Sequence, residues 1–166
     1  MAKVEVRPGI EVSERVLALA RDCYEAVGLD PDKYMVINQG SWHHGALSGS
    51  THDGGGAFDL RIWNLPSDKV EPLVVEIRRR NGCSWRRGPA LDRGGMDPHI
   101  HTIVRDEPGL SRGAQWQVDE YDAGRNGLTG RGQGPDYHPR PTQHPFGTSQ
   151  PGKAEYPSPN VNQEAD

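Results

Sequence analysis

The chain lacks a long apolar stretch, and only 33% of its 166 residues are hydrophobic. No segment approaches the roughly 18 consecutive apolar residues that a membrane-spanning helix needs. The first 14 residues also have no apolar core after their basic start. We therefore expect neither membrane insertion nor a signal peptide.

Cysteine is scarce as well, because Cys23 and Cys83 are the chain's two cysteines and lie 60 residues apart. This spacing gives no CxxC pair and no disulfide framework. We expect both side chains to be reduced, partly buried thiols.

Positive charge is not in excess, because 19 Lys and Arg face 23 Asp and Glu, and the net charge is -4 with histidine neutral. Proteins that bind nucleic acid by neutralising phosphates carry a basic surplus, so we expect no nucleic-acid partner. The main basic cluster is Arg78–Arg80, followed by Arg86 and Arg87. These arginines could form a small anion-binding patch, but the favoured interpretation of Arg78–Arg80 is a solvated helix end.

Hydrophobic periodicity outlines the secondary structure. Apolar residues recur every three or four positions in some segments and alternate in others. In the strand around Asp59, Phe58 and Leu60 face one side and the Asp59 carboxylate faces the other. The patterns predict helices over about 13–28, 67–80 and 111–124, and strands over 34–37, 57–63, 83–86 and 99–104.

Residues 126–166 differ in character from the rest, with seven prolines, six glycines and almost no aliphatic side chains. Such a composition buries too little apolar surface to offset chain entropy. We predict that this segment is a disordered tail and that residues 1–125 form the folded domain.

Histidine is concentrated in two places of the predicted domain. His43, His44 and His52 lie in a long loop rich in Gly and Ser, and His99 and His101 lie in one strand. Zinc in catalytic sites is held by three protein ligands, commonly His nitrogens and carboxylate oxygens, with a fourth position open for water.

The spacing of these residues suggests how they meet. His52 precedes Asp59 by seven residues, and Gly54–Gly56 between them allow a sharp turn. His99 and His101 are two apart, so both point to one face with Cα atoms about 6.6 Å apart. One of these two histidines can bind a metal while the other holds or moves a proton. We predict a single zinc ion on His52, Asp59 and His101.

Residues 50–59, STHDGGGAFD, match the pattern SxHxxGxAxD at every specified position. This motif resembles that of the zinc peptidase superfamily of lysostaphin-type enzymes, D-Ala-D-Ala metallopeptidases and hedgehog domains. The resemblance implies that His52 and Asp59 are the first two zinc ligands. The later HIH resembles the family's HxH, which implies that His101 is the third ligand and His99 a catalytic histidine.

The stretches NQGSW, HIHTIV and SRGAQWQVDEYDAGRNGL extend the resemblance over about residues 38–128, toward a peptidase group of actinobacteria and their phages. It implies an α+β domain whose small antiparallel sheet carries the ligands, flanked by about three helices. It also implies hydrolysis of peptidoglycan peptides, with the chain expected to act as a monomer.

Two departures from the family pattern affect the remaining roles. Many members carry a Glu three residues before the last ligand, where this chain has Pro98. The general base is therefore His99 or Asp97, and His99 is favoured because it shares a strand face with His101. The family's upstream Arg is also missing. Gln39 and His44 are candidates for binding substrate, and Arg86 or Arg87 could meet a substrate carboxylate.

The expected function is a zinc-dependent peptidase, either a D-Ala-D-Ala carboxypeptidase or an endopeptidase, that degrades the cell wall. Without a signal peptide, such an enzyme would be made in a host cytoplasm and act after release, or be carried on a virion, as phage lysis proteins are. The alternative is a zinc-binding recognition domain without catalytic activity. A metal-dependent phosphoesterase is disfavoured because such sites usually add carboxylates for a second metal.

Overall fold

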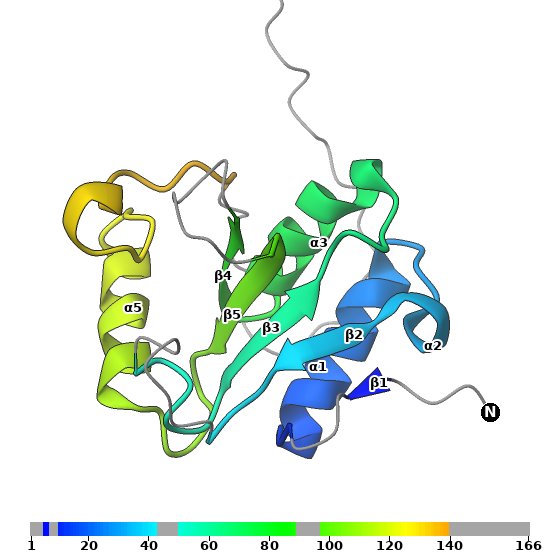
Figure 1. Cartoon of the computed structure of the whole chain (residues 1–166), viewed down its shortest axis with the longest axis horizontal. Helices are drawn as coiled ribbons and strands as arrows, with labels where there is room; N and C mark the ends of the chain where they lie inside the picture. The colour runs from blue at the N-terminus through cyan, green and yellow to red at the C-terminus, as the bar shows by residue number, and fades with distance from the viewer. Residues whose placement is uncertain (1–4, 7–9, 43–49, 89–96, 140–166) are drawn as a thin grey trace, which may run out of the picture.

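A mixed sheet lies at the centre of the protein, in a computed structural model that describes residues 5–6, 10–42, 50–88 and 97–139 (Figure 1). The strand order is β1-β2-β3-β5-β4. The pairs β2–β3, β3–β5 and β5–β4 are antiparallel, and the short β1 pairs in parallel with β2. The strands are β1 (Glu5–Val6), β2 (Val36–Gln39), β3 (Ala57–Arg61), β4 (Gly82–Arg87) and β5 (His99–Val104).

Helices cover both faces of this sheet. The helices are α1 (Glu14–Ala26), the single turn α2 (Pro31–Tyr34), α3 (Ser67–Arg79) and α5 (Arg112–Asp122), with a 3-10 turn η1 (Gly130–Gly132). Figure 1 shows α1 and α3 on one side of the sheet and α5 on the other. The predicted α+β class with an antiparallel sheet is confirmed. No helix of the described residues is long and apolar enough to span a membrane.

The three long helices form where the periodicity predicts them. The Ser13 hydroxyl accepts from the Val16 amide and caps α1, and the Ser111 hydroxyl accepts from the Ala114 amide and caps α5. Asn81 ends the α3 region with a positive φ of 73°, and the chain then enters β4 at Gly82.

One apolar cluster lies on each face of the sheet. Phe58 and Leu60 of β3 pack with α1 and α3 in the larger cluster, whereas Ala57 packs with residues of α5 in the smaller one. This is the alternation predicted for β3. Because α5 covers the second face, Asp59 projects into a buried environment rather than into solvent. Both free cysteines are buried, Cys23 in the larger cluster and Cys83 in the smaller.

The strand predicted at 34–37 begins later than expected. The Asp30 carboxylate accepts from the Asp32 amide, and Pro31 occupies the first turn, so residues 31–34 form α2 instead. The extended strand β2 starts at Val36. The two-residue strand β1 was not predicted, since it is too short to show a periodicity.

The predicted domain boundary at residue 125 is too early. Residues 126–139 pack on the domain, with Asn126 and His138 buried. The remainder of the predicted tail, 140–166, lies outside the described residues. The composition argument failed for 126–139 because polar contacts, rather than apolar burial, hold this segment.

Arg78 is the main anchor of the segment 126–139. Its side chain is 0% exposed, contrary to the interpretation of Arg78–Arg80 as a solvated helix end. The guanidinium forms an ion pair with Asp136 at 2.9 Å and donates to the Ser84 carbonyl through Nε at 2.8 Å. It also donates to the carbonyl of His138 at 3.3 Å. This one buried cation therefore connects α3, β4 and the C-terminal segment.

The same segment covers the outer side of β4, which is the last strand of the sheet. The Arg86 amide donates to Nε2 of His138 at 2.9 Å, and the Tyr137 hydroxyl donates to the Arg86 carbonyl at 2.7 Å. Nδ1 of His138 contacts the Glu71 carboxylate of α3 at 2.7 Å. At Arg86, side chains thus take the place of a neighbouring strand.

Candidate metal centre

Three elements bring His52, Asp59 and His101 together. Asp59 lies in the middle of β3, and His101 lies directly opposite it on β5. His52 belongs to the turn that precedes β3. All three side chains are buried on the face of the sheet that α5 covers.

Glycines allow the turn that returns His52 to the strand. A Cβ atom at Gly54 would lie 2.3 Å from the Gly109 carbonyl oxygen, so a larger residue cannot occupy this position without moving the backbone. Gly56 has a φ of 82°, which favours glycine. The turn therefore packs closely against residues 107–111 and holds His52 over Asp59.

The three side chains of the cluster lie within contact distance of one another. Nδ1 of His101 lies 2.7 Å from Oδ1 of Asp59, and Nε2 of His52 lies 3.4 Å from the same oxygen. One potential ligand atom from each residue lies within 4.8 Å of the other two. The predicted grouping of His52, Asp59 and His101 is confirmed, and this group could hold a metal ion.

Hydrogen bonds behind the cluster determine which imidazole nitrogens face it. Nδ1 of His52 lies 2.8 Å from the Gly40 carbonyl oxygen, which can only accept, so Nδ1 carries the proton. Nε2 of His101 lies 2.8 Å from Oε1 of Gln117, and the Gln117 amide group donates to the Gly127 carbonyl at 3.0 Å. That second bond orients the amide, so Nε2 of His101 donates to Oε1.

It follows that neutral His52 and His101 both direct lone pairs at the Asp59 carboxylate. Three hydrogen-bond acceptors converge there, an arrangement that is stable only when a cation or a proton lies among them. Burial lowers the pKa of His101, and the charges of His52 and Arg87 add to this effect against the opposing charge of Asp59. Burial also lowers the pKa of His52, but the Asp59 charge outweighs it and raises that pKa. A proton on His52 or a metal ion bound by the three residues would satisfy this arrangement.

Asp59 remains a carboxylate in this environment. Burial alone would raise its pKa, but the positive charge that His52 and His101 carry when protonated holds the pKa well below its usual range. The cluster therefore offers two imidazole nitrogens and one anionic oxygen as ligands.

His99 lies at the edge of the same cluster. Its Nδ1 lies 2.7 Å from the Asp97 carbonyl oxygen, so Nδ1 is the protonated nitrogen of the neutral ring. Its Nε2 faces Asp59, 3.8 Å from Oδ2. Asp97 thus contacts His99 through its backbone carbonyl, and Asp97 is exposed. His99 presents a nitrogen that can accept a proton beside the cluster.

The residues predicted to bind substrate do not all lie at the cluster. Gln39 lies opposite Asp59 on β2, after a register shift between Ile37 and Gln39. His44 lies outside the described residues. Arg86 is exposed and opposes Ile100, whose side chain belongs to the α1 and α3 side of the sheet. The structure therefore does not bring Arg86 to the cluster, because alternation along β4 places Arg87 on that face.

Two further side chains complete the cluster. Gln117 of α5 bonds His101 from behind, and the Trp85 ring stacks on His101 at 6.3 Å between centroids with an interplanar angle of 18°. Trp85 lies in the strand predicted at 83–86, whereas sequence reasoning missed Gln117. The one sign of Gln117 in the sequence is that a polar residue stands among the apolar positions of the predicted helix, and this side of α5 is buried.

Replacing Gln117 with Leu is expected to weaken metal binding 10- to 100-fold, since partners of ligating histidines typically contribute about that much. Gln117→Glu retains an acceptor and should bind nearly as well as the wild type. The measurement is a competition titration of Zn²⁺ against a chelating indicator. Gln115→Leu, on the exposed side of α5, is the matched control. Equal affinities of the two Leu variants would contradict this role.

Comparisons of the chain with protein-family models, with curated proteins and with solved structures gave no match.

Proposed function

We propose that the protein is a zinc-dependent peptidase that hydrolyses amide bonds in peptidoglycan peptides. The observation that supports this most is the convergence of acceptor atoms from His52, Asp59 and His101, with the imidazole of His99 beside them. Two histidines and one carboxylate are a known ligand set of catalytic zinc, which leaves a coordination position open.

When bound, zinc would supply a Lewis acid that polarises the scissile carbonyl and lowers the pKa of a water molecule. His99 would take the proton from that water, because its Nδ1 is bonded to the Asp97 carbonyl and its Nε2 faces the ligands. Gln39, opposite Asp59, would donate a hydrogen bond to the substrate backbone.

The choice of peptidoglycan as substrate is supported by the resemblance of STHDGGGAFD and HIH to the zinc peptidase superfamily. The family's glutamate is absent, and Pro98 stands in its place. His99 fulfils the same requirement, a proton acceptor beside the ligands. We propose a wall-degrading role such as that of a phage lysis or virion-associated protein.

The test combines metal analysis with hydrolysis. The purified chain, supplemented with Zn²⁺, is expected to hold one zinc and to release fragments from purified sacculi and stem peptides, as measured by mass spectrometry. His101→Ala should lose both properties while keeping the wild-type circular dichroism spectrum. The metal is measured and not assumed, because two histidines and a carboxylate also bind Fe(II) in oxygenases.

Two results would contradict the proposal. A chain that binds no zinc after supplementation would exclude the metallopeptidase. Zinc binding without cleavage of any wall peptide would instead favour a recognition domain that binds peptides without hydrolysing them.

A further inference from the structure

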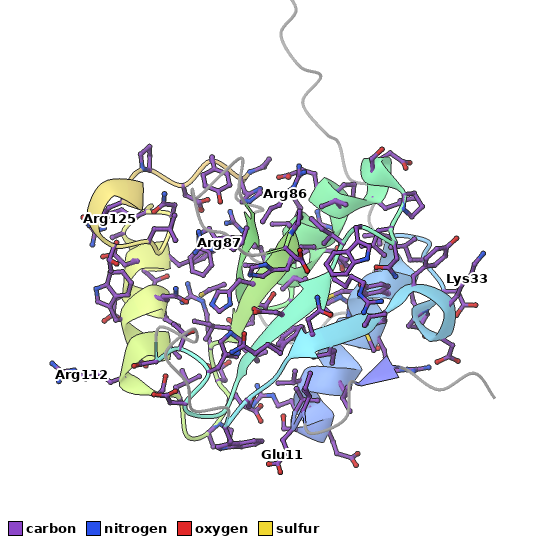
Figure 2. All side chains as sticks on the ribbon, viewed as in Figure 1. Glu11, Lys33, Arg86, Arg87, Arg112 and Arg125 are labelled. Carbon is purple, nitrogen blue, oxygen red and sulfur yellow. The ribbon has the colours of Figure 1, made fainter. Side chains whose placement is uncertain are left out.

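Arg87 lies on the wall of the candidate metal centre that β4 forms. Trp85 opposes His101 and Arg87 opposes His99 in the β4–β5 pairing. Residues directly opposed in antiparallel strands project from the same face, with Cβ atoms about 4.5–5.5 Å apart. Arg87 therefore emerges beside His99. Figure 2 shows Arg87 between β4 and α5, and its neighbour Arg86 further toward α3.

Arg87 is buried, with 4% of the residue exposed, and its contacts hold the guanidinium in place. Nη2 donates to the Asn126 carbonyl at 2.8 Å, and the guanidinium carbon lies 5.1 Å from the centre of the Trp85 ring. Trp85 in turn stacks on the metal-ligand candidate His101. The cation is thus fixed relative to the cluster.

Hydrogen bonds within residues 126–132 fix the Asn126 carbonyl, which accepts from Arg87. The Asn126 side chain donates to the Gly132 carbonyl at 2.9 Å and accepts from the Leu128 amide at 3.1 Å. The next carbonyl, that of Gly127, orients Gln117. Two consecutive carbonyls of this loop therefore position one side chain behind His101 and another beside His99.

We propose that Arg87 binds a carboxylate of the peptide substrate, next to the amide that is cleaved. A guanidinium stays charged at all physiological pH values, and its planar array of donors matches the two oxygens of a carboxylate. Arg87 is oriented in advance, so little side-chain freedom is lost on binding. This inference rests on the proposed peptidase function and selects substrates with a free carboxylate near the scissile bond.

The experiment compares peptides that differ in one charge. The zinc-loaded chain is given the stem peptide L-Ala-γ-D-Glu-L-Lys-D-Ala-D-Ala and two versions, amidated either at the D-Glu carboxylate or at the C-terminus. We expect the wild type to cleave the free acid about 10- to 100-fold more efficiently, in kcat/KM, than one of the amides. Arg87→Met should remove this preference, and Arg87→Lys should keep part of it.

Arg86→Met is the matched control, since it removes the neighbouring charge from the opposite face of β4 and should retain the wild-type preference. Calorimetric binding of the acid product should weaken in Arg87→Met and Arg87→Lys, which gives a readout besides turnover. An unchanged acid preference in the two Arg87 variants, or a wild type that cleaves acid and amides equally, overturns the inference alone. Absence of any cleavage by the wild type overturns the proposed function and the inference with it.

Discussion

A chain ending at residue 125 is expected to lose about 3–5 kcal/mol of its free energy of unfolding, whereas a chain ending at residue 139 should keep the wild-type value. The reason is Arg78, whose buried guanidinium pairs with Asp136 and also donates to the carbonyl of His138. Removing one partner of a buried ion pair leaves a desolvated charge without compensation, which costs about that much. Domains of this size are stable by only about 5–15 kcal/mol, so the loss is severe.

Urea denaturation followed by circular dichroism measures this difference. Asp136→Asn in the full chain isolates the ion pair and should show most of the loss. Asp32→Asn is a suitable control, because Asp32 pairs with Arg21 at 2.9 Å in a partly exposed position, and such pairs contribute about 0–1 kcal/mol. If the chain ending at residue 125 unfolded at the same urea concentration as the wild type, the segment 126–139 would have no stabilising role.

Replacing His99 with Ala is expected to lower kcat by a factor of about 10² to 10⁴ while leaving the zinc content at one per chain. Positioned general bases typically contribute that much to the rate. His99 faces the cluster at 3.8 Å from Oδ2 of Asp59 but is not among the three converging ligands, so zinc should stay bound. Zinc analysis and peptide hydrolysis on the same sample separate the two roles.

Asp97→Ala supplies the control for this prediction. Asp97 contacts His99 through its backbone carbonyl, which the substitution retains, so the activity should change little. A large loss in Asp97→Ala with normal activity in His99→Ala would assign the base to the Asp97 carboxylate instead. Loss of zinc in His99→Ala would make His99 a ligand.

Local patterns in the sequence were enough for much of the fold and for the grouping of His52, Asp59 and His101. The three long helices follow the 3.6-residue period, and α1 and α5 begin at the capping serines Ser13 and Ser111. The alternation in β3 put Asp59 on the correct face, and the spacing of two residues put His99 and His101 together. These predictions depend on neighbours within a few positions along the chain.

Other features depend on contacts between distant residues and could not be predicted in this way. Gln117 meets His101 only because α5 packs across β5, and Arg78 is buried only because Asp136 reaches it from 58 residues away. The choice between Arg86 and Arg87 required the register of β4, which a six-residue strand does not reveal by itself. Composition likewise underestimated residues 126–139, whose polar groups are satisfied by partners elsewhere in the fold.

The cover that Tyr137 and His138 provide over Arg86 also has a consequence for encounters between molecules. The outermost strand of an open sheet offers unpaired amides and carbonyls to any passing extended chain, and this is a common route to aggregation. Here two aromatic side chains occupy the Arg86 amide and carbonyl. Besides pairing with Arg78, the C-terminal segment therefore closes the edge of β4 at Arg86 to pairing with another extended chain.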